Sequence, residues 1–308
     1  PIEIERCQHV GSVQADFQEA RRHGFILTGQ LCKHEPMTPT LLLALVLAQP
    51  LTDWRQPDPQ NLLYVELPAG RVVIELAPRF APAHVANLQK LAREGYFDGT
   101  RLYRSQDNYV VQWGGNGKPA RTAAAALPAE FEISLDAGMP FTPLPDGDVY
   151  APEVGFVDGF PAARDAAAGV AWLAHCYGMV GISRDNDPDT GSGADLYVVT
   201  GHSPRHLDRN ITLVGRVLSG MPLLSGLPRG TGPLGFYEDE AQHIPILATR
   251  VAADLPAAAQ AGLELLRTDT AAFEAHVEAR RNRREPWFHR PAGKVGLCNV
   301  PLPVRPVS

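Results

Sequence analysis

The chain has 308 residues, with 28 Lys and Arg against 34 Asp and Glu, which gives a formal net charge of −6 at pH 7. Hydrophobic residues make up 44% and charged residues 20%, enough to build a buried core, so the composition excludes a disordered chain. The negative charge argues against nucleic acid as the main partner. No apolar run approaches the roughly 20 residues that cross a bilayer, which excludes a polytopic membrane protein.

Residues 37–48 have the pattern of a secretory signal. Eight successive apolar residues end in Val46-x-Ala48, which suits the small-residue rule for signal cleavage. We therefore predict a periplasmic or secreted protein, with residues 1–36 as a leader of doubtful status and residues 49–61 as a linker. The alternative is that the apolar run is a short buried helix and that the protein is cytoplasmic.

The four cysteines lie far apart in the sequence, without the CxxC spacing of zinc or thioredoxin-type sites. In an exported protein, Cys176 and Cys298 would be able to form a disulfide. Two buried free thiols explain these residues equally well. The sequence therefore leaves their pairing open.

From residue 62 the pattern predicts a hairpin, a helix and two further strands. Residues 62–67 and 71–76 are rich in β-branched and aliphatic residues and are separated by a short loop that ends in Gly. Apolar residues at every third position, Val85, Leu88 and Leu91, predict a helix from Ala83, which Gly95 ends. Strands are predicted at about residues 100–104 and 108–113.

Short motifs follow these segments in a fixed order. The first half contains Val85-Ala-Asn87-Leu88, Gly95-Tyr-Phe-Asp-Gly99, Leu102-Tyr-Arg104 and Val111-Gln-Trp-Gly114. The second half contains Gly178-Met-Val-Gly-Ile-Ser-Arg184, Leu196-Tyr-Val-Val-Thr200, His206-Leu-Asp208, Val214-Gly-Arg-Val217 and Gly220-Met221. Together they resemble the signature of cyclophilin-type peptidyl-prolyl cis-trans isomerases, over about residues 62–253.

The resemblance implies a mainly β fold: a closed eight-stranded antiparallel barrel with two capping helices and substrate on its outer face. Two segments have no counterpart in that pattern. Residues 132–177 are a long insertion, which would shape substrate choice or hold the C-terminal segment. Residues 254–308 are predicted to be a helical extension and tail, with one helix around Ala261 and Leu265 and another around Phe273 and Val277.

Rotation about a prolyl bond is slow because amide resonance sets a barrier of ~18–20 kcal/mol. A fixed cation that meets the prolyl nitrogen in the twisted amide lowers this barrier without a nucleophile or a cofactor. The resemblance gives that role to Arg104. The substrate-binding residues that it implies are Tyr109, Val110, Gln112, Ser183, Arg184, Asp195, Leu196, Tyr197, His206 and Leu207.

The sequence therefore predicts a monomeric isomerase, without metal or cofactor, that acts on Xaa-Pro bonds in proline-containing segments of exported proteins. One departure from the family pattern supports a different function. Asp195 stands where the family has a glutamine; it would either pair with Arg104 and hold it away from substrate, or favour basic residues beside the proline. The alternative is thus a weak or inactive peptide-binding or chaperone module.

A third interpretation is a secreted calcium-dependent module. Asp185-Asn-Asp187-Pro-Asp189 resembles the start of a calcium-binding loop. Thr190 stands at the position that requires Gly, however, and Leu196 at the position that requires Glu.

Overall fold

The computed structural model describes residues 52–115 and 119–307. The predicted leader and signal lie outside the described residues, as do Cys7 and Cys32. Within the described part of the chain, no helix is both long enough and apolar enough to cross a membrane.

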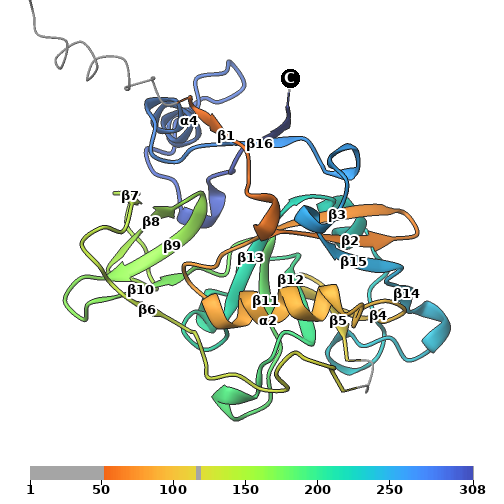
Figure 1. Ribbon diagram of the computed structural model, residues 1–308. Helices are drawn as coiled ribbons and strands as arrows, with labels where there is room; N and C mark the ends of the chain where they lie inside the picture. Colours follow the sequence, from red (N-terminus) through yellow and green to blue (C-terminus); the bar gives the residue numbers. More distant parts are fainter. Residues whose placement is uncertain (1–51, 116–118, 308) are drawn as a thin grey trace, which may run out of the picture. The chain divides into compact units, whose positions relative to one another are not determined.

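The main body is a curled antiparallel sheet of nine strands (Figure 1). Their order across the sheet is β14 (Ile244–Pro245), β4 (Arg101–Ser105), β5 (Val110–Gly114), β12 (Asp195–Val199), β11 (Met179–Ile182), β13 (Leu213–Ser219), β3 (Gly70–Leu76), β2 (Leu62–Leu67) and β15 (Ala248–Val251). The predicted hairpin is confirmed as β2 and β3, and the next two predicted strands as β4 and β5.

The mainly β class is confirmed, but the predicted closed barrel of eight strands is not. The sheet has nine strands, and its edges β14 and β15 are consecutive pieces of one segment. The chain bends between them, so that the amide of Ile246 donates to Thr100 (2.8 Å) and the amide of Leu247 donates to Glu66 (2.8 Å). Both ends of the curled sheet therefore meet this one segment.

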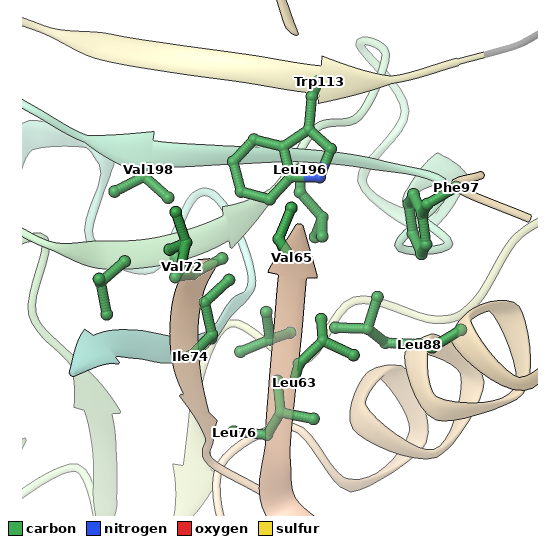
Figure 2. Close-up of a cluster of buried hydrophobic side chains, with 14 of the residues drawn as sticks. Leu63, Val65, Val72, Ile74, Leu76, Leu88, Phe97, Trp113, Leu196 and Val198 are labelled. Carbon is green, nitrogen blue, oxygen red and sulfur yellow. The ribbon is translucent and has the colours of Figure 1, made fainter. Parts of the chain in front are cut away.

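Apolar side chains fill the inside of the curl and form the inner core. Figure 2 shows Leu63, Val65, Ile74 and Leu76 of the hairpin facing Trp113 of β5 and Leu196 of β12. Because side chains alternate across a strand, every second residue of these strands points inward. The inner core is thus a packed interior, as the resemblance implied, and ligands have to bind outside it.

Two helices of the described part of the chain contact the sheet. Helix α2 (Pro82–Arg93) is the predicted helix, and its buried residues include Val85, Leu88 and Leu91, at the predicted spacing of three. Helix α3 (Met221–Ser225) lies against β3. A third helix, α4 (Ala271–Arg281), belongs to the C-terminal segment.

The insertion forms a sheet of its own. Its strands, in spatial order, are β6 (Ile133–Ser134), β10 (Val170–Leu173), β9 (Phe160–Asp165), β8 (Glu153–Val157) and β7 (Phe141–Pro143). Single turns of 3₁₀ helix connect elements throughout the described chain: η1 (Pro59–Asn61), η2 (Pro188–Thr190), η3 (Arg205–Leu207), η4 (Pro233–Gly235), η5 (Glu240–Gln242), η6 (Ala252–Asp254), η7 (Ala257–Ala259) and η8 (Leu297–Asn299).

The C-terminal segment is less helical than predicted. The prediction of a helix around Ala261 and Leu265 is wrong. This segment contains strand β16 (Leu263–Leu266), which lies between β1 (Trp54–Arg55) and β17 (Val304–Pro306). The two neighbouring strands form backbone hydrogen bonds with it. These bonds outweigh the helical preference indicated by two apolar residues four positions apart. Part of the predicted linker is therefore also a strand. The second expected helix is confirmed as α4, whose cap residue Thr270 accepts a hydrogen bond from the Phe273 amide.

The C-terminal segment packs on the insertion sheet. Phe273 of α4 meets Phe156 of β8 edge to face, with 5.0 Å between ring centroids. Cys176 and Cys298 form a disulfide that joins the end of the insertion to η8. We call the apolar cluster between these two segments the outer core. The insertion therefore holds the C-terminal segment, which is one of the two roles predicted for it.

Candidate active site

Arg104 lies on the outer face of β4, and three acceptors hold its guanidinium. Its Nε donates to the carbonyl of Leu234 (2.7 Å) and its Nη1 to Oε1 of Gln112 (3.0 Å). Its Nη2 donates to Oε1 of Gln106. A guanidinium has five N–H donors, so donors remain for a ligand.

A β-bulge turns Arg104 outward. Leu102 pairs with Trp113, and both point into the inner core. Two residues later, Arg104 would point the same way in a regular strand. The register shifts at Tyr103, so that Arg104 pairs with Gln112 on the outer face instead. Bulges commonly re-aim side chains in this way.

The surroundings of Arg104 are partly apolar. Burial lowers the pKa of the guanidinium, while the neighbouring Tyr109 and Tyr103 raise it. The rings of Phe236 and Tyr109 lie 5.3 and 5.9 Å from the guanidinium carbon. Arginine titrates so far above neutral pH that the group remains a cation here.

A small apolar cluster lies on the same outer face. It contains Val110, Tyr197 and Val199, with Tyr109 and Ile211 packed against them. The structure therefore brings together three of the predicted pocket residues. Leu207 is half-buried in η3 and is not part of this cluster; Ile211, which the sequence analysis did not select, lies there instead.

Tyr197 is anchored from beneath by a chain of buried polar groups. Its hydroxyl lies 2.8 Å from Nε2 of His175, and Nδ1 of His175 lies 2.8 Å from Asp208. A carboxylate only accepts, so Nδ1 carries the proton and Nε2 accepts from the tyrosine. Arg205 forms an ion pair with each of two carboxylates. Its Nε lies 2.5 Å from Oδ2 of Asp208, and its Nη1 lies 2.9 Å from Oδ2 of Asp148. The floor of the cluster is thus tied to the insertion, which supplies Asp148 and His175.

Burial shapes the protonation of this chain of groups. It lowers the pKa of His175, although the carboxylate of Asp208 acts in the opposite direction. It raises the pKa of Tyr197 well above its usual value. Both groups are therefore neutral at physiological pH, which is the state that their mutual hydrogen bond requires.

Asp195 does not pair with Arg104. Its Oδ1 accepts a hydrogen bond from the hydroxyl of Tyr103 (2.6 Å). Burial raises the pKa of the carboxyl, and the Tyr103 hydrogen bond partly offsets this. The predicted contact that would have held Arg104 away from substrate is wrong, because the side chain of Tyr103 on β4 contacts Asp195 instead.

The remaining predicted site residues have different positions. Ser183 accepts a hydrogen bond from Nε2 of Gln112 (2.9 Å) and so supports the residue that holds Arg104. Arg184 donates to backbone carbonyls of Asp185, Asn186 and Asn210. His206 is exposed and lines a cavity of about 630 Å³ beside the insertion.

Leu196 is wrongly placed in the predicted site. It is fully buried in the inner core, opposite the hairpin (Figure 2). Asp195 and Tyr197, its neighbours on β12, face outward, and strand alternation sends the residue between them inward.

Three residues beside Arg104 were missed by sequence reasoning: Gln106, Leu234 and Phe236. The last two lie 130 or more positions away in the chain, and Phe236 forms an isolated bridge to Arg104. Leu234 is 66% exposed and has a positive φ of 57°, a conformation rare outside glycine. Only the Pro233-Leu-Gly235 sequence hinted at a turn there.

Two carboxylates of the predicted calcium loop accept hydrogen bonds from backbone amides. Asp187 accepts from the amide of Asp189, which in turn accepts from the amide of Ala129. Among residues 52–115 and 119–307, no group of three or more His, Cys, Asp or Glu side chains is placed to hold a metal ion.

The fold and the site define a mainly β protein that holds a cation on the outer face of a curled antiparallel sheet, beside an apolar cluster. Comparison with known proteins gives the family. Residues 62–251 match the model of the cyclophilin type peptidyl-prolyl cis-trans isomerase family. The chain belongs to this family, and the predicted family and enzyme class are confirmed.

Individual relatives agree. A probable peptidyl-prolyl cis-trans isomerase of Brucella suis is 26% identical over 174 residues, which are 56% of this chain and 74% of the relative. The human peptidyl-prolyl cis-trans isomerase-like 1 is 25% identical over 65% of this chain and 92% of its own length. The crystal structure of cyclophilin AquaCyp293 from Hirschia baltica superposes with a TM-score of 0.67 and 28% identity, covering 82% of this chain and 92% of that one.

Proposed function

We propose that this protein catalyses cis/trans isomerisation of Xaa-Pro bonds in exported proteins, with Arg104 as the catalytic residue. The observation that carries the proposal is the position of Arg104, on the outer face and beside the cluster of Val110 and Tyr197. Family membership makes proline-containing peptide segments the class of partner.

The geometry suits stabilisation of a twisted amide. Twisting localises the lone pair on the prolyl nitrogen, which then accepts a hydrogen bond from a cation. The acceptors of Leu234, Gln106 and Gln112 pre-orient the guanidinium, so little reorganisation is needed when the bond rotates. The proline ring would lie against Tyr109 and Ile211, above the buried Tyr197.

Two observations support export. The segment at residues 37–48 has the pattern of a secretory signal. The disulfide between Cys176 and Cys298 suits an oxidising compartment, since cytosolic thiols are normally kept reduced. Cell fractionation with N-terminal sequencing of the native protein tests this part: a cytosolic protein with free thiols would contradict it.

A protease-coupled assay on a short proline peptide tests the activity. We expect the wild type to accelerate isomerisation and Arg104→Ala to lower kcat/KM about 100-fold or more, the usual effect of removing one charge-stabilising donor. Arg101→Ala is the matched control, since Arg101 is an exposed arginine on the same strand. Equal background rates for wild type and Arg104→Ala would refute catalysis.

The alternative of an inactive peptide-binding module keeps one supporting observation: every nitrogen of the Arg104 guanidinium already donates to a protein acceptor. That module would bind proline peptides in a titration without accelerating their isomerisation. The activity assay on the wild type and Arg104→Ala, together with this titration, therefore decides between the two functions.

A further inference from the structure

A second cavity lies where the C-terminal segment covers strand β13. Its volume is about 430 Å³, within the range of small-molecule sites. Apolar side chains line most of it: Pro161, Met179, Val217, Met221, Leu297, Val300, Pro301 and Leu302. The Cys176–Cys298 disulfide, Tyr177, Gly178, Asn299 and Arg216 form the rest of the wall, and no residue of this cavity donates to or accepts from Arg104.

Arg216 is a buried cation without adequate partners. The residue is only 6% exposed, and its Nε has no hydrogen-bond partner among the described residues. The one carboxylate oxygen near Nε, from Glu75, is 3.7 Å away. Native proteins rarely bury a charged group in this way, because each lost hydrogen bond to water costs free energy.

Glu75 cannot neutralise Arg216 alone, because it is shared. Its other oxygen lies 2.7 Å from Nη1 of Arg55, so two guanidinium groups surround one carboxylate. The Glu75 oxygen that faces Arg216 is itself buried without a hydrogen-bond partner. The group of Arg55, Glu75 and Arg216 therefore carries one excess positive charge, and burial lowers the pKa of Arg216 to about 10.

We propose that this cavity, which we call the Arg216 cavity, binds a carboxylate carried on an apolar chain. The carboxylate would accept hydrogen bonds from Arg216, whose planar fork fits two carboxylate oxygens. The apolar chain would lie along Met179, Val300 and Leu302. A free carboxylic acid and the C-terminus of a peptide share this chemistry.

The proposal goes beyond the isomerase activity and does not depend on it. Position in the fold supports this separation: Arg216 pairs in register with Glu75 of β3 and Met179 of β11, on the outward face that the C-terminal segment covers. The site therefore exists only because the outer core is present.

Thermal unfolding of the full, oxidised protein with four probes tests the proposal. We expect hexanoate to raise Tm saturably, by about 2–4 °C for each ~1 kcal/mol of binding free energy, and hexanamide to have no effect. Acetyl-Ala-Leu with a free carboxylate, against its amide, shows whether a peptide terminus also enters. A response to either acid supports the proposal; no saturable response to either acid, or equal responses to acids and amides, overturns it.

Variants locate the site. Arg216→Met removes the cation and should abolish the response, while Arg79→Met makes the same charge change at an exposed arginine and should retain it. Glu75→Gln leaves Arg216 less neutralised and should lower the Kd for hexanoate. A response that survives Arg216→Met overturns the proposal.

Two further measurements serve if Arg216→Met does not fold. Leu302→Trp fills the cavity with Arg216 intact and should abolish the response. In the wild type, hexanoate should shift the Nε–H resonance of Arg216 in NMR spectra; an unshifted resonance at saturation overturns the proposal. Isomerase assays on the same samples keep this outcome separate from that of the proposed function.

Discussion

The inner core and the outer core stabilise this protein in different ways. The inner core is filled by alternate side chains of strands paired in one sheet and by the apolar face of helix α2. The outer core joins segments more than a hundred residues apart, by the pair Phe156–Phe273 and by the disulfide Cys176–Cys298. Long-range contacts of this kind carry a higher entropic cost of closure, which a covalent link reduces.

The comparison separates stability from catalysis. The groups around Arg104 belong to the outer surface of the curled sheet, and none of its three acceptors is part of the outer core. Changes in the outer core should therefore lower stability with little effect on kcat/KM. One contact links the two regions: the hydroxyl of Tyr197, beside Arg104, is hydrogen-bonded to His175 of the insertion.

The largest effect is expected for Phe273→Ala. The side chain is 1% exposed, so its loss leaves a cavity and should cost about 3–5 kcal/mol of unfolding free energy. Urea unfolding measures this, and kcat/KM per folded molecule should stay unchanged. Trp287→Ala, at an aromatic residue 79% exposed, is the control, with a change within about 0.5 kcal/mol. Equal costs for the two variants would contradict the outer core as a stabilising layer.

Loss of the disulfide should have the next largest effect. Replacing both Cys176 and Cys298 with Ala should lower the unfolding free energy by about 2–4 kcal/mol, since the bond closes a long loop. Wild type treated with a reductant is the matched comparison and should unfold at a similar denaturant concentration. Isomerase activity that disappears with the disulfide, at a temperature where the protein remains folded, would show that the outer core does act on the site.

Tyr197→Phe tests the one link between the two regions. It leaves Nε2 of the buried His175 without a donor, which should cost about 1–3 kcal/mol of unfolding free energy and lower kcat/KM as well. Tyr150→Phe is the control, because Tyr150 is 53% exposed. A variant with wild-type stability and activity would show that the hydroxyl does not position the cluster.

The protonation of His175 predicts a smaller, pH-dependent effect. Because burial lowers its pKa in the folded state below the usual 6.5, the unfolded chain binds more protons as the pH falls through that value. This group should therefore reduce stability from about pH 6.5 downward, until the folded-state pKa is reached. NMR titration of the His175 ring measures it, and a pKa above 6.5 would reverse the sign. The groups that face the ring are Asp208, Tyr197, Arg205 and His206.

Asp195→Asn should give the smallest change in stability, and it should be an increase where the other variants give a decrease. The pKa of Asp195 is raised, so its contribution to stability is present below the unfolded value of 3.8 and is lost as the pH rises through the folded value. An amide still accepts from Tyr103 and carries no charge, so Tm at pH 7 should rise slightly. Asp107→Asn, at a side chain 83% exposed, should leave Tm unchanged. A fall in Tm for Asp195→Asn would disprove the cost assigned to its burial.

Local patterns predicted some of this structure well. The hairpin β2–β3, helix α2 and helix α4 follow from alternation and three- or four-residue spacing. Residues with the same spacing at Ala261 and Leu265 were assigned wrongly, because strands β1 and β17 supply hydrogen bonds that no local pattern reveals. The resemblance assigned Leu196 to the site together with its neighbours Asp195 and Tyr197, although strand alternation would have placed it inside.

The sequence by itself determined the family and the apolar inner face, and it predicted Arg104 as the catalytic cation, because short motifs and strand periodicity can be read from neighbouring residues. Only the tertiary structure decided which way Arg104 points and what holds it. A bulge at Tyr103 turns it outward, and Leu234 and Phe236 reach it from 130 residues away. The partners of Asp195, Tyr197 and Arg216 were likewise decided by packing between distant segments, which determines where a buried polar group finds a hydrogen bond and where it does not.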